Sequence, residues 1–175
     1  MSFTFVPMTE DYARTIVDGW RYGGEYAAYD YVHEAEHILD RTGWGSGIFA
    51  VLGGGGELVG ELSIEFFDEE ENPTEYDEYG DSALINSREL WLGFGLRPDL
   101  TGRGLGGSFV SDCLDFALRQ TGYQGEYVRL GVAAFNQRAI KVYERAGFEP
   151  FQQAEGEIGG RTFAISYMRK RLRAA

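Results

Sequence analysis

A glycine-rich run in the second half of the chain has the residue types of an anion-binding loop. Residues 102–107 read GRGLGG and lie between a segment that predicts a strand and one that predicts a helix. Unpaired N–H groups at a helix start, together with the positive end of the helix dipole, attract anionic oxygens. The four glycines let a phosphate approach the backbone, and Arg103 can add a charge-assisted contact. We therefore predict a phosphate site here. The alternative is a turn that serves chain geometry alone.

Three kinds of phosphate site compete for this loop, and the residues distinguish between them. A nucleoside triphosphate loop ends in Gly-Lys-Ser/Thr, and residues 102–107 contain no lysine. A dinucleotide site has the pattern Gly-x-Gly-x-x-Gly, which Gly102, Gly104 and Gly107 satisfy, but it also needs an acidic residue at the end of the next strand. That strand is predicted to end in two alanines, at 133–134. The diphosphate of coenzyme A is the remaining ligand.

A second pattern with chemical meaning is His-Glu-x-x-His at residues 33–37. On a helix, His33 and His37 would share a face and bind zinc while Glu34 activates water, which resembles the zincin metallopeptidases. Against this, Glu36 places a charge inside the motif, and the chain has no other histidines, so a third ligand would have to be a carboxylate. We expect two half-exposed histidines on a helix and no metal site.

Two consecutive strand-loop-helix units position the glycine loop. In chain order they are a strand at 89–96, a glycine-rich connection at 97–107, a helix at 108–120, a strand at 127–134, and a helix from the N-cap candidate Asn136 to about 145, ended by Gly147. A connection that contains a helix predicts that the two strands lie parallel.

The rest of the chain predicts further strands and helices around these units. They are a strand at 3–6, a helix at 10–18 capped by Thr9, a helical stretch at 26–41, a hairpin of 47–52 with 57–67, and a closing hairpin of 148–153 with 163–168. Residues 61–81 contain ten acidic residues and no Lys or Arg, so this stretch should end a strand and continue as a solvated loop. The basic residues at 169–173 are expected to form a solvated tail.

Composition limits the partners of the protein. The 175 residues include 43% hydrophobic residues, which predicts one compact domain spanning 1–175. The net charge of −12 argues against nucleic acid as a partner and favours cationic small molecules or peptides.

No window has the roughly 20 apolar residues of a membrane span, and the N-terminus has no secretion signal, so we expect a cytoplasmic protein without a membrane partner. A single cysteine, Cys113, excludes an intrachain disulfide and is expected to pack in the core.

The two strand-loop-helix units resemble a known family. LRPDLTGRGLGGSFV looks like motif A of the GNAT superfamily of N-acetyltransferases, and NQRAIKVYERAGF looks like its motif B. The matching residues are Leu96, Pro98, Gly104 and Gly106 in motif A, and Asn136, Ala139, Tyr143, Gly147 and Phe148 in motif B. Thr101 stands where motif A has Gln or Arg, which removes a long polar side chain but leaves the backbone amides. The resemblance implies an α/β fold with a mixed, mostly antiparallel sheet of about seven strands, splayed at a central parallel pair, and about four helices.

The resemblance also implies acetyl-CoA as co-substrate, with no metal, and it implies where that molecule binds. The pantetheine arm would enter between the splayed strands and pair with backbone, and the glycine loop would hold the diphosphate. Asn136 would bind the pantetheine, cap its own helix, or do both. The residues expected to bind the co-substrate are Leu96, Arg97, Thr101, Gly102, Arg103, Gly104, Leu105, Gly106, Gly107, Ser108, Asn136 and Tyr143.

Three residues carry the chemistry that the resemblance implies. The Leu96 N–H would bind the thioester oxygen as negative charge develops on it. Tyr143 would protonate the departing thiolate. Glu89 is the first candidate for the base that deprotonates the amine, although it precedes Leu96 by seven residues where the family commonly has six, so a bulge would be needed to aim it inward. Glu61, Glu65 and a water chain are the alternatives.

The expected function is transfer of an acetyl group from acetyl-CoA to a primary amine of a small molecule or peptide, by direct attack. The alternative from a different class is a catalytically silent module that binds coenzyme A, and a zinc metallopeptidase is a more distant one. The acidic stretch 61–81 and the aromatic residues between 20 and 31 motivate the hypothesis of a cationic acceptor. Dimers are common in the family, and a homodimer is expected here only by that analogy.

Overall fold

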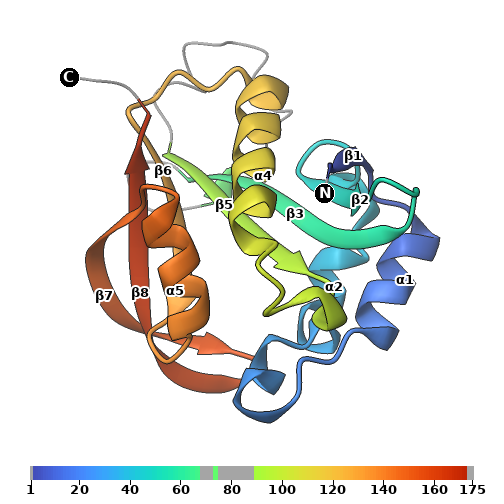
Figure 1. The fold of residues 1–175 in the computed structure, drawn as a ribbon, viewed down its shortest axis with the longest axis horizontal. Helices are drawn as coiled ribbons and strands as arrows, with labels where there is room; N and C mark the ends of the chain where they lie inside the picture. Colours follow the sequence, from blue (N-terminus) through green and yellow to red (C-terminus); the bar gives the residue numbers. More distant parts are fainter. Residues whose placement is uncertain (1, 68–72, 75–88, 173–175) are drawn as a thin grey trace.

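One mixed sheet organises this computed structural model, which describes residues 2–67, 73–74 and 89–172 (Figure 1). The strands are β1 (Thr4–Pro7), β2 (Ile48–Leu52), β3 (Leu58–Phe67), β4 (Pro73–Thr74), β5 (Glu89–Leu96), β6 (Tyr127–Ala133), β7 (Glu149–Ile158) and β8 (Arg161–Arg171). The α-helices are α1 (Glu10–Gly19), α2 (Ala35–Ile38), α4 (Gly106–Thr121) and α5 (Gln137–Arg145). Among the described residues, no helix is long and apolar enough to cross a membrane.

The strand order confirms the predicted architecture. Seven strands follow the order β1-β2-β3-β5-β6-β8-β7, and the short β4 pairs with β3. Neighbours in this order are antiparallel except β5 and β6, which are parallel and lie in the middle of the sheet. This is the mixed sheet with a central parallel pair that the resemblance of the two strand-loop-helix units implies.

The central parallel pair separates soon after it begins. Only Leu90 with Val128 and Trp91 with Arg129 are in register, although β5 continues to Leu96 and β6 continues through Ala133. Beyond the two pairs, the facing edges of β5 and β6 therefore leave backbone groups available to something other than each other.

Apolar side chains pack on both faces of the sheet, because residues alternate between the faces along each strand. On one face, α4 and α5 lie side by side (Figure 1), and Gly106 of α4 allows their close approach, since a Cβ there would lie 3.1 Å from Val142. Cys113 is buried in this core, as expected. On the other face, Ile16 of α1 and Ile38 of α2 pack with Ile48 of β2.

The predicted helix at 26–41 is wrong. The chain there forms η1 (Gly24–Tyr29), η2 (Tyr31–Glu34), α2 and η3 (Arg41–Gly43), of which the three η elements are 3-10 helices. Asp30 interrupts the first two with extended backbone (φ −57°, ψ 128°), and its carboxylate accepts a hydrogen bond from the Tyr22 N–H at 2.7 Å. This tertiary contact competes with the continuous helix that local spacing favours.

The basic tail is also not a solvated terminus. β8 extends through Arg171 because β6 offers an antiparallel partner to its residues 165–171. The Arg169 guanidinium lies 4.2 Å from the centre of the Tyr127 ring, and Arg171 pairs with Glu126 at 2.7 Å. Arg173 and most of the predicted acidic loop lie outside the described residues. Within the acidic stretch 61–81, the structure describes residues 61–67, which belong to β3, and Pro73–Thr74, which form β4.

Candidate active site

The gap between β5 and β6 opens into a cavity of about 900 Å³. Its walls come from both strands, from the segment that carries η1 and η2, from the glycine loop and from α5. Among the residues that line it are Tyr22, Tyr31, Glu61, Leu96, Gly104, Asn136 and Tyr143. The cavity thus brings together most of the residues that the sequence singles out, which are spread over more than 80 positions of the chain.

The β5 wall presents the backbone of Leu96 to the gap. Leu96 lies opposite Gly60 of β3, and one residue further the Arg97 N–H donates to the Val59 carbonyl at 2.8 Å. Hydrogen-bonded and non-hydrogen-bonded pairs alternate in antiparallel strands, so the N–H and C=O of Leu96 point away from β3. The Leu96 carbonyl accepts a hydrogen bond from the Tyr22 hydroxyl at 2.8 Å. The Leu96 N–H faces the cavity as a donor.

The β6 wall follows the same rule. The Ala134 N–H donates to the Ala164 carbonyl at 2.8 Å, so alternation turns the N–H of Ala133 toward β5. There it donates to the Tyr29 hydroxyl at 2.9 Å. Tyr22 and Tyr29 belong to one N-terminal segment, and each contacts one of the two separated strands. That segment therefore bridges the gap at its open end.

The glycine loop presents an uncapped helix start. Gly102 and Gly104 adopt positive φ angles of 73° and 78°, which L-residues rarely adopt. Helix α4 begins at Gly106 without a side-chain hydrogen bond from Leu105 at the N-cap position. The Ser108 hydroxyl donates back to the Leu105 carbonyl at 3.1 Å. The first amides of α4 and the positive end of its dipole are thus available to an anion.

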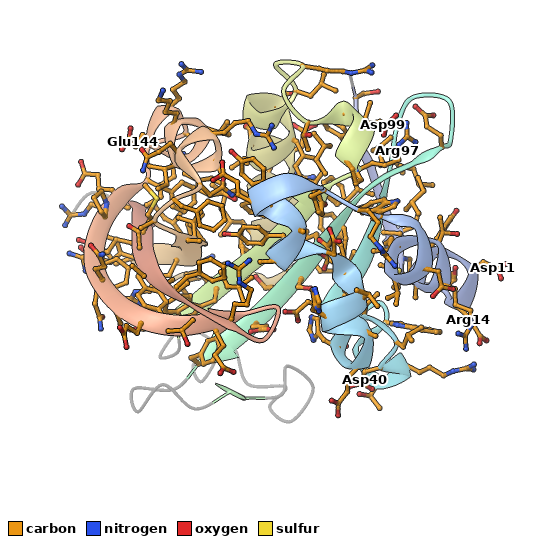
Figure 2. The ribbon with its side chains drawn as sticks, turned by 90° about the horizontal axis from the view of Figure 1, so that it is seen from below. Asp11, Arg14, Asp40, Arg97, Asp99 and Glu144 are labelled. Carbon is orange, nitrogen blue, oxygen red and sulfur yellow. The ribbon has the colours of Figure 1, made fainter. Side chains whose placement is uncertain are left out.

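The two arginines near the loop have different environments. Arg103 is exposed on the loop itself. Arg97 instead pairs with Asp99 at 2.6 Å, and Figure 2 shows the side chains of Arg97 and Asp99 next to each other. The Arg97 guanidinium also donates to the Leu58 carbonyl at 2.9 Å. The guanidinium of Arg97 is therefore held by the protein, while the exposed Arg103 has no ion pair within 4 Å among the described residues. The Thr101 hydroxyl donates to the Pro98 carbonyl at 2.7 Å and closes the short η5 (Pro98–Leu100) before the loop.

Helix α5 carries the other two predicted side chains. Asn136 caps the helix, because its Oδ1 accepts the Ala139 N–H at 3.2 Å. Tyr143 lies two turns further and packs on Phe94 and Phe148, with ring centres 5.7 and 6.2 Å apart. Desolvation raises the pKa of the Tyr143 hydroxyl well above its usual 10, so the group stays protonated and can donate a hydrogen bond into the cavity.

Glu61 is the buried carboxylate of the site. It lies opposite Gly95 in the β3–β5 pair, one residue from Leu96, and is 3% exposed. Its carboxylate accepts hydrogen bonds from the Tyr31 hydroxyl at 2.8 Å and from the Ser63 hydroxyl. Burial raises the pKa of Glu61 to about 7, although both hydrogen bonds oppose the shift. A carboxylate in this state can take up and release a proton near neutral pH.

Glu89, the first candidate for the base, does not lie near the Leu96 N–H. It lies at the opposite end of β5, seven residues or about 23 Å of extended strand from Leu96. Its carboxylate pairs with Arg129 at 2.6 Å and accepts from the Trp91 indole N–H at 3.3 Å. Glu65 is nearer, on the same face of β3 as Glu61, with a side chain 47% exposed. Of the three sequence candidates, the geometry favours Glu61.

The His-Glu-x-x-His residues do not share one continuous α-helix. His33 lies on η2 and His37 on α2, and Glu34 between them has non-helical backbone (φ −108°, ψ 17°). The His37 Nε2 lies 3.0 Å from the Ser63 Oγ. Among the residues that the structure describes, no three or more His, Cys, Asp or Glu side chains are grouped so that they could hold a metal ion.

The sequence did not identify the residues that surround the Glu61 carboxylate, which are Tyr31, Ser63 and His37. A signal existed on β3, where Glu61 and Ser63 are two residues apart and so share a face. No sequence signal indicated the contact between Glu61 and Tyr31, because these residues are 30 positions apart and their contact depends on the space that Gly95 leaves. A Cβ at that glycine would overlap the Tyr31 hydroxyl.

Comparisons with known proteins agree with this architecture. A sequence model described as the acetyltransferase (GNAT) family matches residues 9–148. A search of curated protein sequences finds no significant match.

Solved structures of similar fold include N-acetyltransferases. A chimera of the spermidine N-acetyltransferase SpeG from Vibrio cholerae with hSSAT is 18% identical, with a TM-score of 0.68 over 98% of this chain and 96% of that chain. The spermidine/spermine N-acetyltransferase SpeG from Vibrio cholerae, in complex with manganese ions, is 18% identical, with a TM-score of 0.62 over 97% and 92%. A candidate phosphinothricin N-acetyltransferase is 15% identical, with a TM-score of 0.64 over 99% and 100%. At these identities the likeness concerns the fold.

Proposed function

Because this chain belongs to the acetyltransferase (GNAT) family, we propose that it transfers the acetyl group of acetyl-CoA to a primary amine of a small molecule or peptide. The amine would attack the thioester directly, without a metal. The observation that carries this proposal is the position of the Leu96 N–H, which faces the gap between the two separated parallel strands. The buried carboxylate of Glu61 lies close by, because Glu61 pairs with Gly95, the residue before Leu96.

The residues present suit the parts of acetyl-CoA. The amides at the start of α4, with Arg103 beside them, would hold the diphosphate. The positive φ angles of Gly102 and Gly104 favour glycine, and the missing side chains of these glycines leave the backbone open to the ligand. The pantetheine would lie between β5 and β6, where Asn136 can contact it in addition to capping α5. The Leu96 N–H would stabilise the negative charge that develops on the thioester oxygen.

Proton transfers would be carried by two side chains. Glu61 would take the proton from the acceptor ammonium, because only a free amine is nucleophilic. This assignment replaces Glu89, which is ion-paired to Arg129 far from Leu96. Tyr143 would protonate the departing thiolate. A coenzyme thiol with a pKa near 8.5 needs this assistance only in part at neutral pH.

Thiol release from acetyl-CoA, measured against a panel of primary amines, tests the proposal. Coenzyme A binding is measured in parallel by calorimetry. Amine-dependent release of free thiol supports an acetyltransferase. Heat of coenzyme binding without any thiol release across the panel would support the silent binding module instead. Hydrolysis of a peptide substrate that is lost when a chelator removes zinc would favour the metallopeptidase alternative.

A cationic acceptor is the substrate class that the surface supports best. A second hollow of about 580 Å³ shares Glu65, Leu92, Gly93 and Gly131 with the main cavity, so the two adjoin each other. The aromatic rings of Phe67, Trp91, Phe151 and Tyr167 line it together with Glu65 and the Glu89–Arg129 ion pair, so Glu65 is the carboxylate there that no arginine neutralises among the described residues. Glu65 and aromatic faces attract ammonium groups, and the net charge of −12 attracts cations at longer range.

Acceptor kinetics test this class. Polyamines should be acetylated with a higher kcat/KM than neutral amines of similar length, and added salt should reduce the difference because it screens charge. Glu65→Gln should raise KM for the polyamine and leave KM for the neutral amine unchanged. Equal rates for the two kinds of amine, with no effect of salt, would contradict the cationic preference. A homodimer and a cytoplasmic location stay predictions from the sequence.

A further inference from the structure

We propose that Ser63 and His37 form a proton relay that carries the proton accepted by Glu61 out of the acceptor site to solvent. The inference rests on the proposed function, since it concerns the proton that acetylation of an ammonium releases. It extends that function by giving a role to two residues outside the predicted machinery, including one histidine of the His-Glu-x-x-His pattern.

Three contacts define the chain of groups. The Ser63 hydroxyl donates to one oxygen of Glu61, and the Ser63 Oγ lies 3.0 Å from the His37 Nε2. The other oxygen of Glu61 accepts from the Tyr31 hydroxyl at 2.8 Å. Glu61 and Ser63 are two residues apart on β3, so both side chains lie on the sheet face that α2 covers, where His37 stands. The three groups therefore form a continuous hydrogen-bonded path.

Exposure increases along this path from Glu61 to His37. Glu61 is 3% exposed and Ser63 is 7% exposed, whereas the side chain of His37 is 38% exposed. The opposite direction ends at Tyr31, which is 9% exposed. Among the described residues, Glu61 is the hydrogen-bond partner of the Tyr31 hydroxyl, so no onward acceptor continues the path in that direction. With the cavity filled by substrates, the contacts of Glu61 that the structure describes lead to solvent through Ser63 and His37.

The transfer balances without any group beyond these residues and water. When Glu61 is protonated, the Ser63 hydroxyl turns its hydrogen from Glu61 to the unprotonated Nε2 of His37, and the Glu61 O–H donates to the Ser63 oxygen. The Glu61 O–H bond then breaks as an O–H bond forms on the Ser63 oxygen. The original O–H bond of Ser63 breaks at the same time, and an N–H bond forms on the His37 Nε2. The resulting imidazolium lies 4.0 Å from the Glu65 carboxylate, which stabilises its charge, and it then releases a proton to water. Glu61 is left ionised for the next turnover.

The charged and titratable surroundings of Glu61 come from several elements. They are Tyr22 before η1, Tyr31 and Glu34 on η2, His37 on α2, and Cys113 on α4. Of these groups, His37 is the one that favours the ionised form of Glu61 by its charge. Removing His37 should therefore also displace the pH profile of turnover to higher pH.

Kinetics of His37→Gln and Ser63→Ala test the relay in the full-length protein. Each change should lower kcat about tenfold while KM for acetyl-CoA and for the amine stays within twofold. Added imidazole should restore kcat of His37→Gln, and the restoration should increase with the concentration of neutral imidazole. His33→Gln is the matched control, because this exposed histidine lies four residues earlier and is not among the hydrogen-bond partners that the described residues offer to Glu61.

A conservative variant separates the relay from packing. Ser63→Thr keeps the hydroxyl, and Gly93 beside it leaves room, since even a Cβ at that glycine would lie 3.8 Å from the Ser63 Cβ. It should retain most of the turnover that Ser63→Ala loses. An unchanged kcat and pH profile in His37→Gln, or no response of that variant to imidazole, would overturn the relay. A raised amine KM with unchanged kcat would show instead that His37 contacts the acceptor.

Nitrogen NMR of the histidines makes the relay testable without turnover. The His37 Nε2 shift should show an inflection from the ionisation of Glu61, and that inflection should vanish in Glu61→Gln and shrink in Ser63→Ala. If the inflection is present but no amine is acetylated, the proposed function fails while the proton path stands. If acetylation proceeds and the inflection and imidazole rescue are both missing, the relay fails and the acetyltransferase stands.

Discussion

Glu61 and Gly95 face each other across β3 and β5, and the missing side chain of Gly95 is what admits the Tyr31 hydroxyl to the Glu61 carboxylate. A donor from the N-terminal segment thereby reaches a carboxylate in the middle of the sheet. The position of the proposed base thus depends on a glycine of the neighbouring strand, next to the Leu96 N–H.

A methyl group at Gly95 should disrupt this contact. Gly95→Ala should destabilise the protein by about 1–3 kcal/mol, because the new Cβ overlaps the Tyr31 hydroxyl and displaces it. Urea unfolding measures the loss. Gly93→Ala on the same face is the control, since its Cβ would meet only the Ser63 Cβ at an ordinary 3.8 Å. Equal effects of the two changes would contradict the steric explanation.

Removing the Glu61 carboxylate should remove the base. The kcat/KM for the amine should rise with pH through about 7 in the wild type, because Glu61 must be ionised to accept a proton. Glu61→Gln should lower kcat about 100-fold and abolish this rise. Steady-state kinetics across pH 5.5–8.5, an interval chosen to span roughly the expected transition, measure both effects. A larger loss in Glu89→Gln than in Glu61→Gln would return the role to Glu89.

The same carboxyl should make folding stability depend on pH. Its pKa rises from 4.5 in the usual state to about 7 in the folded protein, so between these values the folded state binds more protons than the unfolded state. Stability should then fall as pH rises from about 4.5 to 7, by on the order of 3 kcal/mol from this group. Urea unfolding of the wild type and of Glu61→Gln at the two ends of the interval isolates the effect. A difference between the two proteins that does not change with pH would contradict it.

Tyr143 should assist turnover without being essential. Tyr143→Phe should lower kcat about tenfold and leave a measurable rate, because a coenzyme thiolate is a tolerable leaving group near neutral pH. The ring contacts with Phe94 and Phe148 survive the change, so the melting temperature should stay close to that of the wild type. Complete inactivity of a folded variant would show that protonation of the thiolate is obligatory.

The glycine loop offers a matched pair of substitutions. Gly104 and Gly56 have similar positive φ angles, 78° and 83°, and a Cβ at either would meet nothing within 4 Å. Gly104→Ala and Gly56→Ala should therefore cost the same stability, about 1–2 kcal/mol for a left-handed alanine. Only Gly104→Ala should weaken coenzyme A binding, by about tenfold or more in calorimetry, because its methyl lies where the diphosphate would approach. Equal coenzyme affinity in the two variants would remove the diphosphate from this loop.

Several elements could be predicted from the sequence because local signals define them. The strand at 89–96 has the predicted bounds, and Asn136 caps α5 as its side chain and position indicate. The two successive strand-loop-helix units predict the parallel pair, because a helical crossover connects parallel strands. The residues of motifs A and B were enough to predict the family.

Other features required contacts between distant segments. The stretch 26–41 has the spacing of one helix, but Asp30 binds the Tyr22 N–H and interrupts it. The basic residues at 169–171 look like a tail, but β6 recruits them into β8. In both cases a tertiary partner outweighs the local preference, which is worth only tenths of a kcal/mol per residue.

By itself, the sequence determined the order of the elements, the parallel pair and the glycine loop, since each is encoded by neighbours in the chain. Only the tertiary structure decided which carboxylate stands beside the Leu96 N–H. Glu89 shares a strand with Leu96, yet strand geometry keeps the two far apart, whereas pairing of β3 with β5 brings Glu61 next to it. The proton affinity of Glu61 depends on burial under Tyr31, and burial is a property of the whole fold rather than of any local segment.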